Sequence, residues 1–262
     1  MGHQAEGTVA ALGCEIAYRA AGDGPPVVYL HGAGGLRWGA ALDGLAERFR
    51  VYGLELPGFG RSTLPDSVNS VPDAADVVAA VMGELGRGER MHLIGTSLGG
   101  RVAAWLAVRH PERVDRLVLE SPAAFRPPEL PPLSAYSPEE LRRLLYGNPE
   151  QAPPFDDPAV RQRQLQAVGR LTKGVSWDTE LERRLGEIQA PTLILFGTLD
   201  GLVPPEMGRI YKERIPQSFL IYVYQAAHAI QWDRPDAFVE LVSDFLTRGE
   251  AFVVPRAKEA VR

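Results

Sequence analysis

The sequence predicts an α/β protein whose mostly parallel central sheet carries helices on both faces. Continuous apolar runs, typical of strands buried on both faces, alternate along the chain with segments of helical character. In the middle of the chain a stretch rich in proline and charge interrupts this alternation and contains no strand run. The 262 residues therefore indicate one large domain with an insertion.

The first part of the core is expected at residues 1–121. Its first two strands are joined by Gly13-Cys14 and should be antiparallel, and the later ones are buried runs. The expected strands are Thr8–Leu12, Glu15–Ala20, Val27–Leu30, Val51–Leu54, the run that begins at Met91, and Val114–Leu119. The expected helices are Trp38–Arg48, Asp73–Leu85 and the Ala-rich segment after Gly99.

Residues 122–189 are expected to form a helical cap inserted after the sixth strand. The composition changes at Pro122, and three charged helical pieces follow. These pieces are Pro138–Tyr146, Pro158–Leu171 and Thr179–Ile188. Ligands bind at the carboxyl ends of the strands in such sheets. A helical insertion that leaves one of these ends starts beside the site, so we expect a cap rather than a surface decoration.

The sheet resumes at residues 190–262. The expected elements are the strands Pro191–Phe196 and Ser218–Tyr224 and the helices Glu206–Arg214 and Asp236–Thr247. Residues Gln225–Trp232 read as a loop, and the polar tail Gly249–Arg262 is expected to be loosely held.

Composition excludes several classes of function. The net charge of −5 gives no electrostatic case for nucleic acid or an anionic membrane as partner. The only cysteine is Cys14, so neither an internal disulfide nor a cysteine-based metal site is expected. No apolar run spans a bilayer and the N-terminus lacks a signal pattern, which favours a cytoplasmic protein. We expect a small-molecule substrate and no metal or cofactor.

The stretch Gly95-Thr96-Ser97-Leu98-Gly99 lies between an apolar strand run and an Ala-rich helix. This context fits a nucleophile elbow, in which a sharp strand-to-helix turn exposes the serine hydroxyl above the sheet. Side chains at Gly95 or Gly99 would collide with their neighbours in such a turn. Ser97 is therefore the candidate nucleophile.

A serine hydroxyl needs a general base, and the base needs a carboxylate that orients it. His228 is the candidate base, because it lies in a loop after the last expected strand. Two carboxylates end neighbouring strands, Asp200 and Glu120. Asp200 is favoured, since the Val203-Pro204 turn can direct its short side chain inward; Glu120 is the alternative.

The oxyanion of an acyl-transfer reaction needs two N–H donors. Leu98, the residue after the nucleophile, supplies one, and Ala33 in the glycine-rich loop His31–Gly35 is the best placed for the other. His31 itself is expected to stabilise this loop by hydrogen bonds. For the substrate pocket we expect contributions from Gly34, Phe125, Trp177, Val203 and Ala229, with Leu144, Leu145 and Phe155 as further wall candidates.

The chain resembles the α/β-hydrolase superfamily over nearly its whole length. The resemblance rests on His31-Gly32 before a helix, Leu56–Ser62, Gly95–Gly100, Gly197–Asp200 with Val203-Pro204, and His228–Trp232. It implies the α/β-hydrolase fold, the triad Ser97, Asp200 and His228, an oxyanion hole from Ala33 and Leu98, and a helical cap that shapes an acyl pocket.

Some residues depart from the patterns of this superfamily. Glu55 stands where many relatives carry aspartate, and the His31–Gly35 loop lacks the H-G-G-G run of one group of lipases and esterases. It also lacks the longer Gly-Pro-Gly loop of the carbon–carbon bond hydrolases of aromatic breakdown.

The sequence therefore favours a serine hydrolase that cleaves a small, largely apolar ester through an acyl-enzyme. The alternative is a carbon–carbon bond hydrolase of a vinylogous diketone, which similar proteins perform with the same triad. A ligand-binding protein without catalysis is the third reading, and the retained triad residues disfavour it.

Overall fold

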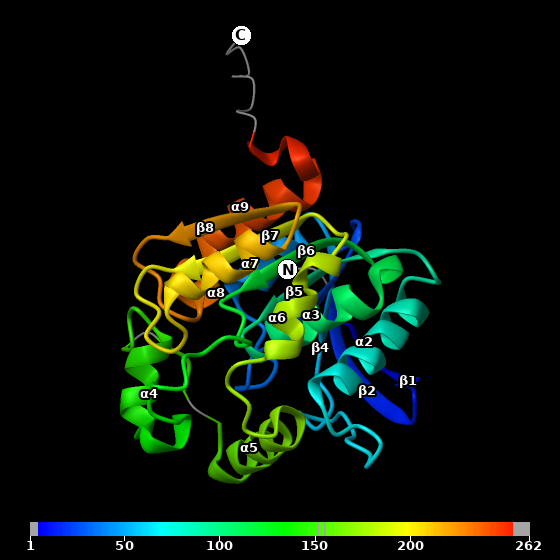
Figure 1. The fold of residues 1–262 in the computed structure, drawn as a ribbon. Helices are drawn as coiled ribbons and strands as arrows, with labels where there is room; N and C mark the ends of the chain where they lie inside the picture. Colours follow the sequence, from blue (N-terminus) through cyan, green and yellow to red (C-terminus); the bar gives the residue numbers. More distant parts are fainter. Residues whose placement is uncertain (1–4, 151, 155, 254–262) are drawn as a thin grey trace.

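The computed structural model describes residues 5–150, 152–154 and 156–253, and an eight-stranded sheet runs through them (Figure 1). The strand order is β1-β2-β4-β3-β5-β6-β7-β8. The pairs β1–β2 and β2–β4 are antiparallel, and all the others are parallel. The strands are β1 (Ala5–Ala11), β2 (Cys14–Ala21), β3 (Pro26–Leu30), β4 (Arg50–Leu54), β5 (Met91–Thr96), β6 (Val114–Glu120), β7 (Thr192–Gly197) and β8 (Ser218–Val223). The predicted fold class is confirmed.

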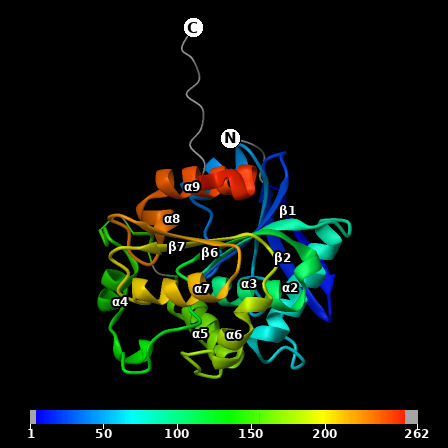
Figure 2. The same ribbon diagram turned by 45° about the horizontal axis from the view of Figure 1, so that its top comes forward.

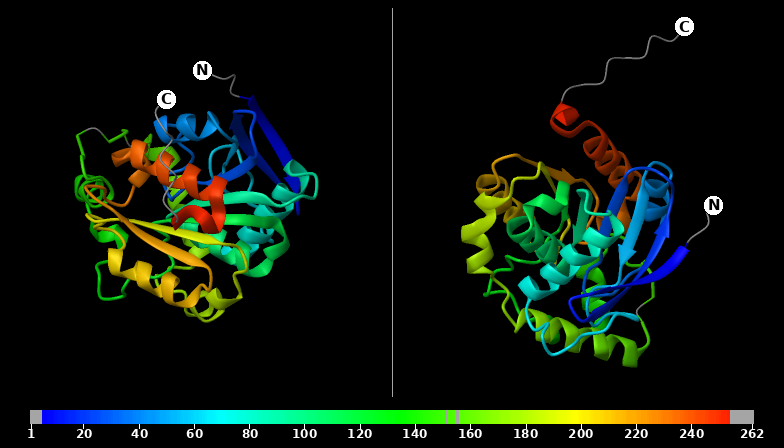
Figure 3. Two further views of the ribbon diagram at one scale, coloured as in Figure 1. Left: turned by 90° about the horizontal axis from the view of Figure 1, so that it is seen from above. Right: turned by 90° about the vertical axis from the view of Figure 1, so that its right-hand side faces the viewer.

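Helices cover both faces of the sheet, as Figure 2 shows. The core helices are α1 (Ala40–Ala46), α2 (Val71–Leu85), α3 (Leu98–Arg109), α7 (Gly208–Arg214), α8 (Ile230–Asp233) and α9 (Pro235–Arg248). One buried apolar cluster joins the sheet to α2, α3 and α7. On the opposite face α1 and α9 lie side by side (Figure 3) and build a second cluster around Leu45 and Phe238. The sheet is thus buried on both faces, which explains its apolar strand runs.

In its described residues, the segment between β6 and β7 carries three α-helices of its own. They are α4 (Pro138–Leu145), α5 (Pro158–Thr172) and α6 (Thr179–Arg184). A 3-10 turn, Leu185–Glu187, follows α6, so the helix expected to reach Ile188 ends earlier. The segment also contains an isolated antiparallel bridge between Phe125 and Trp177, which the sequence did not indicate.

Helix α1 and the loop after β8 also differ from the sequence-based expectation. Helix α1 begins at Ala40 instead of Trp38, because the extended Gly39 precedes it and the Trp38 indole instead donates to the Asp43 carboxylate at 2.8 Å. The loop after β8 contains the short helix α8. Within the described residues no helix has the length and apolar character needed to cross a membrane.

The start of the tail is packed, contrary to the prediction that all of Gly249–Arg262 is loosely held. The Phe252 ring lies 5.8 Å from that of Phe219 and 5.7 Å from that of Phe245. Such edge-on pairs add to the apolar contact on the α9 face. Residues 254–262 lie outside the described part of the chain.

A buried ion pair ties the inserted segment to the helix behind Ser97. The Nε and Nη2 atoms of Arg101, on α3, donate to Asp178 Oδ2 at 3.0 and 2.9 Å. The Trp105 indole donates to the same oxygen at 2.8 Å, and Asp178 Oδ1 caps α6 through the Leu181 N–H at 3.0 Å. Both members of the pair are buried, so removing one leaves an uncompensated charge.

We therefore expect Asp178→Ala to lower the free energy of unfolding by about 3 kcal/mol, because Arg101 would stay buried without its anion. Urea denaturation followed by circular dichroism measures this loss. The control is Glu139→Ala, which removes the exposed ion pair with Arg143 and should change stability little. Equal effects of the two substitutions would contradict the role of Asp178.

Candidate active site

The loops that carry the predicted residues meet at one edge of the sheet. The register pairs Leu30 with Gly95 and Thr96 with Glu120, so β3, β5 and β6 end at a common level. Strand β7 ends beside them, with Leu195 paired to Glu120. Strand β8 ends there too, with Val223 paired to Gly197. Four segments therefore leave the sheet together: the oxyanion loop (His31–Gly35), the elbow (Gly95–Gly99), the acid loop (Gly197–Pro204) and the histidine loop (Gln225–Trp232).

Ser97 sits on a strained turn between β5 and α3. Its φ of 54° and ψ of −114° are costly for a residue with a side chain. A Cβ on Gly95 would lie 2.4 Å from the Gly99 carbonyl oxygen, and one on Gly99 would lie 2.3 Å from that of Leu30. Only glycine fits both positions, which is the geometry of the predicted elbow.

The structure brings His228 and Asp200 together. His228 Nδ1 lies 2.9 Å from Asp200 Oδ2, and both side chains are buried. The other oxygen, Asp200 Oδ1, accepts from the Leu202 and Val203 N–H groups at 2.9 Å each. The carboxylate therefore accepts the Nδ1 proton and leaves the Nε2 lone pair for another partner. His228 Nε2 is buried and has no hydrogen-bond partner in the described residues.

Glu120, the alternative acid, has other partners. Its Oε2 accepts from Thr96 Oγ1 at 2.5 Å and its Oε1 from the Gln231 N–H at 2.9 Å. No hydrogen bond joins it to the His228 ring among the contacts of the described chain, whereas Asp200 makes one. The geometry thus favours Asp200 as the residue that orients His228.

The candidate oxyanion donors flank the elbow. A Cβ on Gly32 would lie 3.1 Å from Ser97 Cβ, so the loop after β3 passes directly beside the serine. Ala33 follows within a turn closed by the Gly35 N–H and the Gly32 carbonyl at 3.1 Å. Leu98 is the first residue of α3, so its N–H has no hydrogen-bond partner inside the helix. Free N–H groups at a helix N-terminus suit an anion.

His31 holds the oxyanion loop in place. Its Nδ1 lies 2.6 Å from the Gly32 carbonyl oxygen, and its Nε2 accepts from the Leu56 N–H at 3.0 Å. One donor and one acceptor nitrogen require the neutral ring. Burial lowers the pKa of His31 to about 4, which keeps it neutral. Glu55 stabilises the neighbouring turn, since its Oε2 accepts a hydrogen bond from the Arg61 N–H at 2.6 Å.

The candidate pocket residues fall into two groups. A Cβ on Gly34 would meet nothing within 4 Å, so open space adjoins it, and Ala229 follows His228 directly. Val203, in contrast, is fully buried and holds Asp200 through its N–H. Phe125 is fully buried between the rings of Trp177 and Tyr211, at 5.6 and 4.8 Å. Phe155 lies outside the described residues.

The inserted segment bonds directly to loops of the site. The carbonyls of Leu144 and Leu145, at the end of α4, accept from the Gly201 N–H at 3.3 Å and the Ala229 N–H at 3.0 Å. These donors follow Asp200 and His228 in sequence. On the other side, Gln164 Nε2 of α5 lies 3.3 Å from the Gly34 carbonyl oxygen and 2.9 Å from Asp156 Oδ2.

Sequence analysis missed Gln164, although a signal exists. Gln164, Ala167 and Leu171 are the buried residues of α5, and their spacing places them on one helix face. A glutamine on an otherwise apolar face indicates a specific polar partner. The carbonyl contacts of Leu144 and Leu145 leave no such signal, because any residue type supplies a backbone oxygen.

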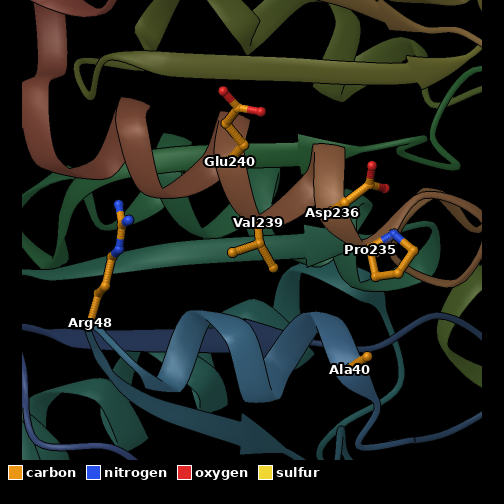
Figure 4. Close-up of a pocket in the computed structure, with 6 residues that line it drawn as sticks. All are labelled: Ala40, Arg48, Pro235, Asp236, Val239 and Glu240. Atoms are coloured by element: carbon orange, nitrogen blue, oxygen red, sulfur yellow. The ribbon is translucent and has the colours of Figure 1, made fainter.

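Other polar features lie away from this edge. A surface hollow between α1 and α9 is shown in Figure 4, and none of the predicted site residues lines it. Its lining residues are Ala40, Arg48, Pro235, Asp236, Val239 and Glu240. In the described part of the chain, no three histidine, cysteine, aspartate or glutamate side chains are grouped so that they hold a metal ion.

Comparison with known proteins shows the family to which the chain belongs. A family model described as the alpha/beta hydrolase fold matches residues 25–181 and 134–235. The chain belongs to the alpha/beta hydrolase family. Among the relatives of this hydrolase is a pimeloyl-[acyl-carrier protein] methyl ester esterase of Aeromonas hydrophila subsp. hydrophila. The two are 33% identical over 256 residues, which cover 86% of this chain and 96% of the relative.

A second group of relatives is named for the hydrolysis of unsaturated hydroxy-oxo acids. A 2-hydroxy-6-oxononadienedioate/2-hydroxy-6-oxononatrienedioate hydrolase of Burkholderia vietnamiensis is 29% identical, over 85% of this chain and 87% of the relative. The solved structure of a 2-hydroxy-6-oxo-6-phenylhexa-2,4-dienoate hydrolase from Rhodococcus superposes with a TM-score of 0.79 at 25% identity. The superposition covers 94% of this chain and 100% of the Rhodococcus chain. The alpha/beta hydrolase described here is thus a serine hydrolase.

Proposed function

We propose that this hydrolase cleaves a small, largely apolar carboxylic ester through an acyl-enzyme on Ser97. The observation that carries the proposal is the buried His228, whose Nδ1 is held by Asp200 and whose Nε2 has no partner in the described residues. A buried nitrogen without a hydrogen-bond partner costs folding free energy, so such atoms are rare in native proteins. Its presence here supports a role in binding a reacting group. The strained Ser97 lies at the same edge of the sheet.

In the first half of the reaction, the Ser97 hydroxyl oxygen attacks the ester carbonyl carbon and His228 Nε2 takes its proton. The negative charge that forms on the carbonyl oxygen faces the N–H groups of Ala33 and Leu98. Asp200 stabilises the imidazolium and keeps the ring in the required tautomer. The carbon–oxygen bond to the alcohol then breaks, and His228 returns the proton to the departing alkoxide.

In the second half, water replaces the alcohol. His228 takes a proton from the water as its oxygen attacks the acyl carbon, and the same two N–H groups hold the second oxyanion. The bond to Ser97 Oγ breaks, His228 protonates that oxygen, and the carboxylic acid leaves. This sequence requires only the chain's own residues and water.

The inserted segment 122–189 is proposed as the cap that selects the substrate. Its bonds to Gly201, Ala229 and Gly34 support this, because they seat α4 and α5 against the loops of the site. The half-buried Trp177 of this segment, which packs against the apolar core, favours an apolar acyl group.

A series of p-nitrophenyl esters of increasing acyl length tests the proposed activity. We expect turnover with a clear optimum of kcat/KM at one chain length, and no turnover in Ser97→Ala. Absence of hydrolysis across the series by the folded wild-type protein would contradict the ester assignment.

Carbon–carbon bond hydrolysis is the second candidate, and the named relatives favour it. A coloured vinylogous dienoate distinguishes the two functions, because its absorbance falls when the bond is cleaved. The His31–Gly35 loop lacks the Gly-Pro-Gly run of those enzymes, so we expect the ester to be the better substrate. A higher kcat/KM for the dienoate than for every ester would reverse this order.

Trp177 tests the specificity role of the inserted segment. Its indole donates to Glu182 Oε2 at 2.8 Å and its ring packs on Phe125. We expect Trp177→Ala to shift the preferred acyl length. The free energy that discriminates between esters should change by about 1–3 kcal/mol per methylene-sized misfit, and phosphonate should still label Ser97. Leu165→Ala, an exposed position on α5, is the control and should leave the profile unchanged. An unaltered profile in Trp177→Ala would remove this residue from the pocket.

A further inference from the structure

A second carboxyl group is hydrogen-bonded to the loop that carries His228 and has no part in the chemistry described so far. Glu120, the last residue of β6, is fully buried. Both of its oxygens accept hydrogen bonds, one from the Thr96 hydroxyl and one from the Gln231 N–H. An ionised carboxylate only accepts, so donors on both oxygens suit its charged form.

The partners of Glu120 flank the reacting residues. Thr96 directly precedes Ser97, and the Glu120 carbonyl accepts from the Ser97 N–H at 2.9 Å. Gln231 follows His228 by three residues, at the start of α8. Glu120 is therefore joined to the elbow on one side and to the histidine loop on the other.

Neutral groups complete this buried network. The Tyr29 hydroxyl, from β3, lies 3.2 Å from both Thr96 Oγ1 and Gln231 Nε2. The titratable groups that face Glu120 are Tyr29 and His228. Tyr146, at the end of α4, interacts electrostatically with Tyr29. His228 is the one of these that gains a positive charge during the proposed reaction.

We propose that Glu120 is a positioning residue that acts through His228, and that its buried negative charge stabilises the imidazolium formed when His228 takes the proton of Ser97. This inference rests on the proposed function, in which His228 is the base. Attraction between charges is stronger in the interior than in water, so a carboxylate helps here without touching the ring. Asp200 fixes the ring, and Glu120 adds a second negative charge beside it.

The charge on Glu120 depends on pH. Burial raises the pKa of its carboxyl from the ordinary value of 4.5 to about 7. The group is therefore neutral in the folded protein below neutral pH and charged above it. Because the unfolded chain ionises near 4.5, the folded state loses stability as pH rises from about 4.5 through about 7.

The test compares the pH dependence of kcat/KM in wild type, Glu120→Gln and Tyr29→Phe with one p-nitrophenyl ester. Glutamine keeps an acceptor for the Gln231 N–H but carries no charge. We expect its plateau to fall about tenfold and the midpoint of its acid limb to move about one unit to lower pH. Tyr29→Phe disturbs the same network but keeps the carboxylate, so its midpoint should match wild type.

Two results would overturn the inference. One is a Glu120→Gln enzyme whose acid limb has the wild-type midpoint. The other is a Tyr29→Phe enzyme whose midpoint moves as far as that of Glu120→Gln, which would indicate a purely structural network. Thermal unfolding gives a check on folding: Glu120→Gln should gain stability relative to wild type between pH 5 and pH 8.

A measurement on the wild-type protein covers the case in which Glu120→Gln does not fold. The ¹³C carboxyl resonance of Glu120, assigned by correlation with its backbone, should be that of the ionised carboxylate at the pH of the kcat/KM plateau. A carboxyl that is still protonated there would contradict the inference. Failure of the proposed function is recognised separately, by full activity in Ser97→Ala.

Discussion

Ser97→Ala is expected to lower kcat/KM for p-nitrophenyl esters by a factor of about 10⁴ or more. Alanine removes the hydroxyl that attacks the carbonyl carbon and leaves the rest of the elbow in place. The neighbouring glycines still make room for the turn, so the fold should be unchanged. Esterase assays on purified protein, with circular dichroism of the same sample, measure both effects.

The matched control for this substitution is Ser121→Ala. Ser121 lies at the end of the neighbouring strand β6, is also buried with a positive φ of 43°, and its hydroxyl has no partner in the described residues. We expect this enzyme to keep its activity. Near-wild-type turnover by Ser97→Ala would contradict the mechanism.

Asp200→Asn is expected to lower kcat by about 10⁴. The amide of asparagine carries no charge to stabilise the His228 imidazolium. It can also donate to Nδ1 and so hold the ring in the wrong tautomer, with the proton on Nε2. Its oxygen still accepts from the Leu202 and Val203 N–H groups, so the acid loop should keep its shape.

Comparison with Glu120→Gln distinguishes the two carboxylates. The Asp200 oxygen contacts the histidine ring, whereas Glu120 contacts the backbone three residues further on. We expect a loss of about tenfold for Glu120→Gln, roughly a thousandth of the effect of Asp200→Asn. If Glu120→Gln lost most of its activity and Asp200→Asn kept it, Glu120 would be the acid.

The sequence predicts the fold and the central site well because their signals are local. Gly95, Ser97 and Gly99 form one continuous turn, and their spacing alone indicates the elbow. Asp200 and His228 each follow a buried strand, so the parallel sheet brings them to the same edge. Neither inference requires knowledge of how distant side chains pack.

The contacts of the inserted segment were not predictable in the same way. The bonds from Gly201 and Ala229 to backbone carbonyls of α4 depend on where the helix is seated, which tertiary packing decides. The sequence favoured Asp200 over Glu120 only through the turn that follows it, since both carboxylates lie at the ends of neighbouring strands. Their hydrogen bonds separate them: Asp200 Oδ2 lies 2.9 Å from His228 Nδ1, whereas Glu120 accepts from the Gln231 N–H.

Some boundaries differ from those that hydrophobic periodicity indicates. Trp38 is apolar and fits the periodicity of α1, yet its indole bonds to Asp43 and the helix starts two residues later. Phe252 lies in a polar tail and still packs on α9, because two aromatic rings are within reach.

The most direct test of the account is the site of covalent labelling by a fluorophosphonate, located by peptide mass spectrometry. The reagent reacts with a serine that an adjacent base activates, so it reports the nucleophile without any assumption about the substrate. The account predicts one adduct, on the peptide that contains Ser97, and its loss in Ser97→Ala. An unlabelled folded wild-type protein, or an adduct on another residue that persists in Ser97→Ala, would contradict it.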